Sequence, residues 1–184
     1  MAKRSPLQAR VGGSTPTSSP QSPRQFTFVR TANKDGAALN EQWHSALPYI
    51  PVFHIQFSFV AEWGGKPYAV GLWGRPVART LDDAVFLELR RMAICAEAPK
   101  NTASCMLAWM VRELREQRPE IQTFISYQDT ARHTGTIYRA AGWYPIHLRS
   151  PVNWDGSAQT KKAPSRKRNG PLLKAPKVRW QRDA

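Results

Sequence analysis

The strongest helical pattern in this chain lies between two strand-forming runs, and this order limits the possible folds. From Thr102 to Arg118, apolar side chains recur every three or four positions, at Leu107, Met110, Val111 and Leu114. Pro119 ends this helix. A strand is predicted over Val85 to Ile94, before the helix, and another over 121–127, after it. The sequence therefore predicts a strand–helix–strand unit at the centre of a mixed fold.

Further elements are predicted on both sides of this unit. Strands are expected at Gln25 to Arg30, His54 to Trp63, Tyr68 to Trp73 and Gly142 to Leu148, and short helices at Ala37 to Ala46 and 134–141. The turn signal Gly64-Gly65-Lys66-Pro67 joins two of these strands into a hairpin over 54–73. Mixed strands followed by a β-α-β-α-β order indicate the α/β (α+β) class.

Positive charge is concentrated at the two ends of the chain. The formal net charge of the 184 residues is +14, of which residues 1–25 contribute +4 and residues 151–184 contribute +7. The intervening residues contribute only +3. We therefore expect one folded domain over 25–150, a disordered basic arm over 1–24 and a basic, disordered tail over 151–184.

The composition of the tail favours a polyanionic partner. The stretch KKAPSRKRNGPLLKAPKVRW interleaves cations with proline, leucine and Trp180. Cations neutralise phosphates and an aromatic ring can stack on bases, so DNA or another nucleic acid is the favoured partner. Charged arms that serve only solubility, with no partner, are the alternative. A membrane surface is disfavoured because the tail has no clean amphipathic period.

Several classes of protein are excluded by what the sequence lacks. Cys95 and Cys105 do not make a disulfide framework, and no Cys/His spacing typical of a metal site occurs. No apolar run approaches the length of a membrane span, and the N-terminus lacks the apolar core of a signal peptide. We expect a cytoplasmic protein with no predicted metal ligands; the sequence does not give its oligomeric state.

The residues before the main helix form a candidate phosphate site. Lys100, Asn101, Thr102, Ala103 and Ser104 lie where the first helical N–H groups are unpaired and the helix dipole is positive. Lys100 would add a charge, and the neighbouring side chains would add polar groups. The alternative is that Asn101 or Thr102 only caps the helix. Neither a GxGxxG nor a Walker motif is present.

A second candidate site follows the strand over 121–127. The segment SYQDTARHTGTIYRAAGW contains Asp129, His133 and Tyr138 within ten residues. Asp129 is a candidate base or orienting group, His133 a candidate acid or base, and Tyr138 a candidate proton donor. The alternatives are a turn aspartate, a solvated histidine and a core tyrosine with its hydroxyl satisfied. The spacing of these residues alone does not decide between the catalytic roles and the structural alternatives.

Longer stretches of the sequence resemble a known family. The stretches LELRRMAICAEAPKNTASCMLAWMVREL and ISYQDTARHTGTIYRAAGW are similar to those of the Mom family, phage DNA-modification proteins with the GNAT acyltransferase fold. GRPVARTLDD, over 74–83, is similar to a phage-borne branch of GNAT-like proteins. The resemblance covers roughly residues 43–147, and its most specific motifs are PKNT, SYxD and HTGTIYRAxGW.

The resemblance implies a mostly antiparallel central sheet flanked by helices, and acetyl-CoA or a related acyl-CoA as cofactor. The turn that holds the CoA pyrophosphate in this fold corresponds to Lys100 through Ser104, where Asn101-Thr102-Ala103-Ser104 replaces the usual glycine-rich pattern. A metal requirement has been suggested for Mom proteins, but the sequence assigns no ligands to one.

The resemblance also implies a reaction on the exocyclic amine of adenine in DNA. It assigns active roles to Asp129 and Tyr138, and it matches His44 to a histidine near the N-terminus of the family's domain. The target base must be flipped or single-stranded to reach such a site. Trp143 and Trp73 are candidates to stack this base, although their predicted strands favour the core.

Three functions follow from these observations. The first is a Mom-like acyltransferase that modifies DNA in the cytoplasm, that of the host cell if a phage encodes it. The second is an ordinary GNAT N-acetyltransferase acting on an amine of a protein or small molecule. The third is a non-catalytic DNA-binding protein on a degenerate GNAT fold.

Overall fold

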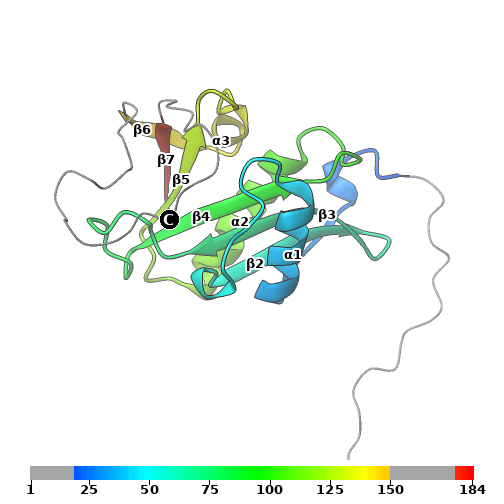
Figure 1. Cartoon of the computed structure of the whole chain (residues 1–184), viewed down its shortest axis with the longest axis horizontal. Coiled ribbons are helices and arrows are strands. Elements are labelled where there is room, and N and C mark those ends of the chain that lie inside the picture. The colour runs from blue at the N-terminus through cyan, green and yellow to red at the C-terminus, as the bar shows by residue number, and fades with distance from the viewer. Residues whose placement is uncertain (1–18, 150–176) are drawn as a thin grey trace, which may run out of the picture.

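A computed structural model of the chain describes residues 19–149 and 177–184, which form one mixed sheet with helices on both faces (Figure 1). The strand order is β1-β2-β3-β4-β5-β7-β6. The strands are β1 Thr27–Thr31, β2 Phe57–Trp63, β3 Lys66–Gly74, β4 Phe86–Ile94, β5 Thr123–Asp129, β6 Tyr144–Arg149 and β7 Lys177–Asp183. The helices are α1 Asn33–Trp43, α2 Thr102–Gln117 and α3 Thr136–Ala140, with 3-10 turns η1 Pro23–Gln25 and η2 Val52–His54.

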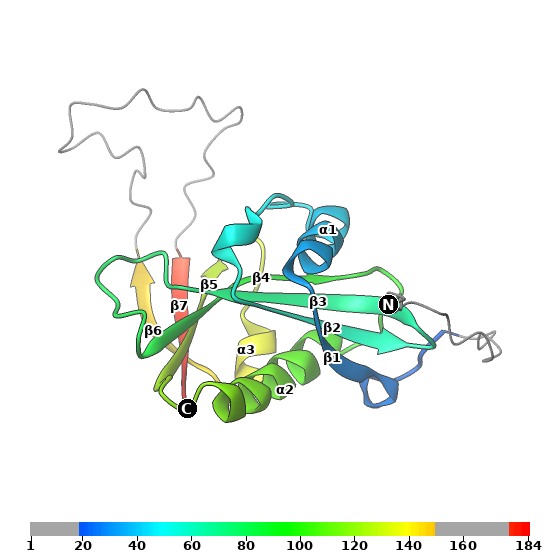
Figure 2. The same cartoon turned by 90° about the horizontal axis from the view of Figure 1, so that it is seen from below.

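The helices divide the core into two layers. In Figure 2, α1 lies on one face of the sheet, and α2 and α3 lie on the other. The face under α2 buries the larger cluster, to which the helix contributes Met106, Leu107, Met110, Val111 and Leu114. The face under α1 buries a smaller cluster that includes Ile50, Ile55 and Leu72. The apolar spacing that predicts α2 therefore corresponds to the side of the helix that packs on the sheet.

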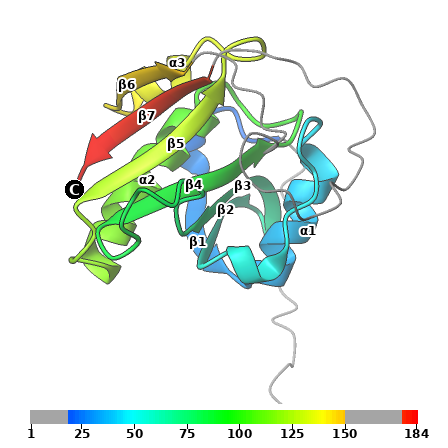
Figure 3. The ribbon, with the colours of Figure 1, turned by 60° about the vertical axis from the view of Figure 1, so that its left-hand side comes forward.

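One strand pair differs from the rest of the sheet. All neighbouring strands are antiparallel except β4 and β5, which are parallel. Their pairing runs only from Phe86–Thr123 to Leu89–Ser126. Beyond these residues β4 pairs with β3 and β5 pairs with β7, so the two strands separate (Figure 3). The backbone of one edge of each strand is therefore left without a strand partner in the described chain.

The expected elements are confirmed, with shifted ends. The hairpin over 54–73 and the helix beginning at Thr102 are present. The first helix begins at Asn33, earlier than Ala37, because tertiary contacts hold its start: the Asn33 side chain donates to the Ile55 carbonyl (2.8 Å) and accepts from the Ser58 hydroxyl (3.0 Å). The strand expected over 121–127 extends to Asp129, so Asp129 ends a strand and does not lie in a loop.

The expectation of a disordered tail over 151–184 is wrong for its last residues. Lys177–Asp183 forms β7, which lies between β5 and β6 (Figure 1). The sequence of β7 is rich in cations, but its Trp180 side chain is fully buried in the core and holds the strand in the sheet. Burial of a whole tryptophan side chain stabilises a strand strongly, and the cations around it remain solvated and cost less than this burial gains.

The rest of the two predicted arms is only partly described. Within the expected N-terminal arm, Pro23–Gln25 forms the 3-10 turn η1, which Ser22 caps through a bond from the Arg24 N–H (3.3 Å). Of the disorder expected over 1–24 and 151–184, the parts over 1–18 and 151–176 lie outside the described residues. The domain limits 25 and 150 remain predictions.

Candidate active site

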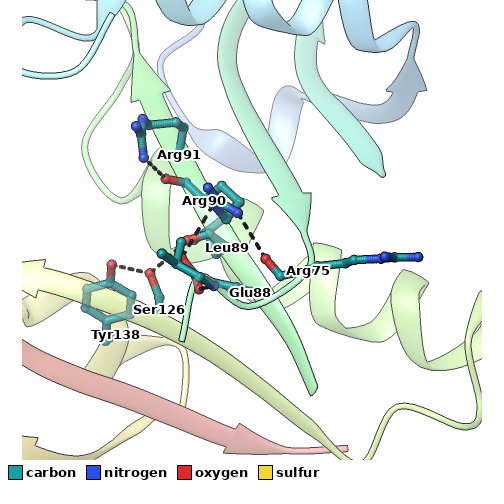
Figure 4. A network of polar contacts seen from close by, with 8 residues as sticks. Arg75, Glu88, Leu89, Arg90, Arg91, Ser126 and Tyr138 are labelled. Atoms are coloured by element: carbon teal, nitrogen blue, oxygen red, sulfur yellow. Dashed lines mark hydrogen bonds and ion pairs between the residues drawn. The ribbon is translucent and has the colours of Figure 1, made fainter. Parts of the chain in front are cut away.

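The hydroxyl of Tyr138 lies where β4 and β5 separate. Ser126, the last β5 residue paired with β4, donates from Oγ to the Leu89 carbonyl (3.3 Å) and shares a hydrogen bond of 2.9 Å with Tyr138 (Figure 4). Burial raises the pKa of Tyr138 above its ordinary value, although the Ser126 bond acts in the opposite direction. The phenol is therefore held protonated at neutral pH at the point where the two strands part.

Aromatic rings fix the position of the Tyr138 side chain. Trp180 stacks on it with ring centroids 5.2 Å apart and planes 10° apart, and Trp143 meets its edge at 5.8 Å. The indole N–H of Trp143 is buried and has no acceptor among the described residues. This donor is the kind of orphaned polar group that a bound molecule can satisfy.

A chain of contacts connects Trp180 to the loop between β5 and α3. The Trp180 indole donates to Gln128 (2.7 Å), and the Gln128 amide donates to the His133 carbonyl. Gly135 has a φ of +77° and lies against both side chains, so close that a Cβ there would stand 2.4 Å from the Trp180 ring. The loop that carries His133 is thus shaped by a strand far away in the sequence.

The Asp129 carboxylate is directed into its own turn. Its Oδ1 accepts from the Ala131 N–H (3.0 Å), and its Oδ2 lies 3.8 Å from Arg132 Nε. Its backbone carbonyl accepts from the N–H groups of Arg132 and His133, both at 3.1 Å. The turn interpretation of Asp129 fits these contacts, and the residue organises the exposed segment that presents His133.

His44 is the residue that ends α1. Burial lowers the pKa of His44, and the charges of Arg91 and His133 lower it further. Its Nδ1 accepts from the N–H groups of Ala46 (3.3 Å) and Leu47 (3.2 Å). The neutral ring therefore carries its proton on Nε2 and acts as a donor there. The charge of Arg132 also lowers the pKa of His44, and Arg132 itself lies 3.8 Å from Asp129.

The sequence does not predict a group of charged residues that the structure brings together on β4. Arg90 has no partner in β3, because Leu72 pairs with Arg91 and Trp73 pairs with Leu89. Glu88 is buried, accepts from the Val77 N–H (2.8 Å) and lies 3.6 Å from Arg90. Figure 4 shows this network running from Arg75 along β4 to Tyr138. The signal in the sequence is Glu88 together with the pair Arg90-Arg91 inside a strand whose other residues are apolar.

The N-terminus of α2 is left uncapped. Asn101 adopts a left-handed conformation (φ 67°) and makes no side-chain cap bond. Thr102 donates to the Pro99 carbonyl (2.7 Å) and Ser104 donates to the Asn101 carbonyl (3.1 Å), so neither accepts from the helix. The N–H groups of Ala103 and Ser104 have no acceptor in the part of the chain that the structure describes. Asn101 therefore occupies the N-cap position without the side-chain bond that a cap residue makes.

An open cleft lies beside this helix end. It has a volume of about 520 Å³ and is lined by residues 19–23 of the N-terminal segment together with Glu97, Pro99, Lys100 and Asn101. Lys100 is exposed. Free N–H groups, the positive end of a 16-residue helix and a nearby ammonium group suit an anion such as pyrophosphate.

Further features of the described residues concern base stacking, metal binding, the cysteines and membrane helices. Trp73 and Trp143 are buried in the core, so neither presents a face to a base. No three His, Cys, Asp or Glu side chains within 19–149 and 177–184 come together as a metal site. Cys95 and Cys105 are free. In the same ranges, no helix has the length and apolar character needed to cross a membrane.

The fold is that of GNAT acetyltransferases. The ribosomal-protein-alanine N-acetyltransferase of Brucella melitensis aligns at 13% identity with a TM-score of 0.59, over 86% of this chain and 99% of that chain. A Bacillus subtilis acetyltransferase solved with CoA aligns at 11% identity with a TM-score of 0.56, over 86% and 99%. A GNAT-family acetyltransferase of Streptococcus pneumoniae aligns at 10% identity with a TM-score of 0.56, over 86% and 98%.

The sequence itself identifies the family. No curated protein matches the chain in a sequence search. The Mom protein family matches residues 60–168, which is more than half of the chain and includes β4, α2, β5 and Tyr138. The chain therefore belongs to the Mom protein family and has the GNAT fold.

Proposed function

We propose that this protein transfers an acyl group from an acyl-CoA to the exocyclic amine of adenine in DNA. The observation that carries the proposal is the Tyr138 hydroxyl, held 2.9 Å from Ser126 at the point where β4 and β5 separate. Membership of the Mom family and the CoA bound to the Bacillus subtilis acetyltransferase of the same fold support the choice of substrates.

The residues at the start of α2 fit the charged end of an acyl-CoA. The N–H groups of Ala103 and Ser104 would donate to the pyrophosphate, and Lys100 would neutralise part of its charge. The free backbone edges of β4 and β5 would hold the extended arm, and the Trp143 N–H offers one further donor. When bound, the acyl-CoA supplies a thioester carbonyl activated toward amines.

Tyr138 acts as the proton donor in this proposal. Its phenol is protonated at neutral pH because burial raises its pKa, and two tryptophan rings restrict its movement. A positioned donor of this kind protonates a leaving thiolate and typically contributes a factor of about 10²–10⁴ in rate. Ser126 positions the hydroxyl.

The acceptor side is formed by α1 and the β5–α3 loop. His44 donates from Nε2 to an acceptor atom of the base or its phosphate, since its Nδ1 is occupied by two backbone N–H groups. His133, which is exposed, accepts the proton that the amine loses. The Asp129 carbonyl accepts from the His133 N–H (3.1 Å) and so holds the backbone that carries His133. The basic arms would hold the DNA phosphates.

Mass spectrometry of nucleosides tests the proposal. DNA from cells that express the full chain is digested, and a new deoxyadenosine derivative is expected with the wild type. Tyr138→Phe should reduce its rate of formation in vitro by about 10²-fold or more, with little change in CoA affinity. Tyr144→Phe, at an exposed tyrosine bound to Asp183, is the matched control and should remain active.

The same experiment separates the competing functions. Two proteins of the same fold are, by name, N-acetyltransferases of ribosomal-protein alanine, so a protein amine is the alternative acceptor. Acylation of peptide or small amines without any modified nucleoside would overturn the DNA assignment. The absence of any shift in melting temperature with CoA would indicate a non-catalytic protein.

A further inference from the structure

A β-bulge in β4 places two consecutive arginines on the same face of the sheet. Leu72 of β3 pairs with Arg91 and the next residue of β3 pairs with Leu89, so Arg90 is the extra residue of the bulge. Leu89 belongs to the cluster under α2, and Met92 packs against the same cluster. The two arginines between them therefore lie toward the α1 face, where Leu72 is buried.

The bulge holds two guanidinium groups beside a single buried carboxylate. Glu88 accepts from the Val77 N–H and lies 3.6 Å from Arg90. Arg91 forms no ion pair with a carboxylate of the described ranges; its side chain donates to the Arg90 carbonyl (2.6 Å), and its Nε is buried without an acceptor there. Burial lowers the pKa of Arg91, and the charge of Arg90 lowers it further. A guanidinium withdrawn from water without a counter-ion is costly, and a bound anion would remove that cost.

The Arg91 guanidinium lies at the edge of β4 that β5 leaves. The last paired residues of the two strands are Leu89 and Ser126. Figure 4 shows Arg91 on the side of β4 where Ser126 and Tyr138 lie, and Arg75 on the opposite side. At about 3.3 Å per residue, Arg91 follows the end of this pairing by roughly 7 Å along the strand.

The chemistry of an acyl-CoA limits which anion can reach Arg91. In the proposed function, the start of α2 holds the pyrophosphate, and the free edges of β4 and β5 hold the arm, which ends in a thioester near Tyr138. The arm contains amides and a hydroxyl but no charge, so it gives the guanidinium nothing to neutralise. A carboxylate at the far end of a short acyl group stands only a few carbons beyond the thioester. Its two oxygens match the planar fork of an arginine.

A DNA phosphate fits this arginine less well. Phosphates of a nucleic acid remain near the surface and pair with exposed cations, which the chain supplies at its two ends, +4 over 1–25 and +7 over 151–184. Arg91 is half-buried, and its direct strand partner Leu72 is fully buried. A small anion that enters with the acyl group suits this position better.

We propose that Arg91 binds a carboxylate at the far end of the acyl group, so that the protein transfers the acyl group of a dicarboxylic acid, such as malonyl or succinyl. The proposal rests on the proposed function and names the group that is transferred. The amine nitrogen bonds to the thioester carbonyl carbon and loses one proton, while the C–S bond breaks and CoA leaves as the thiol. The carboxylate reaches the product unchanged, so Arg91 determines specificity and takes no part in the bond changes.

Calorimetry in the absence of DNA tests the proposal by measuring how acetyl-CoA, malonyl-CoA and succinyl-CoA bind to the full chain. The wild type should bind malonyl-CoA or succinyl-CoA about 10- to 150-fold more tightly than acetyl-CoA, as expected for hydrogen bonds between charged groups. Arg91→Gln should lose this preference and keep its affinity for acetyl-CoA. The matched control is Arg79→Gln, which removes the same charge from an exposed arginine between β3 and β4 and should keep the preference.

Thermal melts separate binding from a structural role of Arg91. Arg91→Gln removes a charge that has no counter-ion and should melt at or above the wild-type temperature. Arg90→Gln leaves the buried Glu88 carboxylate without its cation and should melt at a lower temperature. If Arg91→Gln melts as low as Arg90→Gln, Arg91 is a structural residue and the proposal is wrong.

Three binding results would also overturn the acyl assignment. The first is equal affinity of the wild type for the three thioesters, and the second is a preference that survives in Arg91→Gln. The third is a preference lost equally in Arg79→Gln, since the net charge of the chain would then explain it. An Arg91-dependent preference in a protein that forms no deoxyadenosine derivative would instead sink the proposed acceptor and leave the acyl assignment standing.

Discussion

At the scale of single residues, buried neighbours decide which polar groups are available for chemistry. Tyr138 keeps its proton because its surroundings are apolar and its ring is enclosed by Trp143 and Trp180. His44 stays neutral because of burial and nearby cations. The Asp129 carboxylate, in contrast, is occupied by its own turn. Residues of one motif thus differ in role because their packing differs.

Gly135 allows a direct test of the contact between Trp180 and the β5–α3 loop. Gly135→Ala meets both a positive φ and a clash with Trp180 at 2.4 Å, whereas Gly65 has the same φ of +77° with nothing within 4 Å of an added Cβ. We expect Gly65→Ala to lower the free energy of unfolding by about 1 kcal/mol and Gly135→Ala by about 2–4 kcal/mol. Urea denaturation measures both, and equal losses would show that the ring does not constrain this glycine.

Glu88 should make stability fall with rising pH. Burial raises its pKa above the ordinary value of 4.5, so the folded state binds its proton more tightly than the unfolded state. Stability is therefore lost as the pH rises from 4.5 through the raised pKa. Glu88→Gln keeps an acceptor for the Val77 N–H and should lose this dependence. Urea denaturation of both proteins between pH 4 and 8 checks this, and parallel curves would contradict it.

At the scale of elements, one feature of the sheet and one helix end create the proposed site. The parting of β4 and β5 after Leu89 and Ser126 frees backbone, and the start of α2 leaves N–H groups open. Both features leave polar backbone without partners, which a folded protein retains only rarely. A ligand that pairs with them explains why the element ends are built in this way.

Ser104→Asp separates the stability of α2 from its binding of an anion. A carboxylate in the first turn interacts well with the helix dipole and should raise stability by about 0.5 kcal/mol. The same charge repels a pyrophosphate, so CoA affinity should fall by about tenfold or more. Ser104→Ala is the control for loss of the hydroxyl. Thermal melts and calorimetry with CoA measure the two effects, and unchanged CoA binding would rule out this helix end as the phosphate site.

The strand β7 also affects how truncations are interpreted. It separates β5 from β6, and its Trp180 supports Tyr138 and Gln128. Removing all of 151–184 would therefore remove part of the sheet along with the cations of the tail. Loss of activity in such a truncation would not distinguish DNA from other acceptors.

At the scale of the whole molecule, most of the positive charge of the tail lies outside the strand that the tail contributes to the fold. The cations of the tail can be changed while β7 stays intact, by replacing five residues with glutamine: Lys161, Lys162, Arg166, Lys167 and Arg168. We expect the slope of log affinity for duplex DNA against log salt to flatten by up to about 4.5, with the melting temperature unchanged. Titrations at several salt concentrations measure this. An unaltered slope would place the phosphate contacts elsewhere.

The sequence by itself determines the elements whose evidence is local. Periodic apolar residues give α2, the Gly64-Gly65 turn gives the hairpin, and the ordered motifs give the family. These features depend on neighbours a few residues apart, so a single sequence contains them.

Only the tertiary structure decides what depends on distant contacts. It places Trp180 from a basic tail behind Tyr138, lets the charge of His133 lower the pKa of His44, and leaves Tyr49 and Phe53 exposed while Trp73 is buried. Composition assigns Lys177–Asp183 to a solvated tail because cations dominate it, yet one buried indole outweighs them. Burial is a property of the assembled sheet and cannot be read from residues adjacent in sequence.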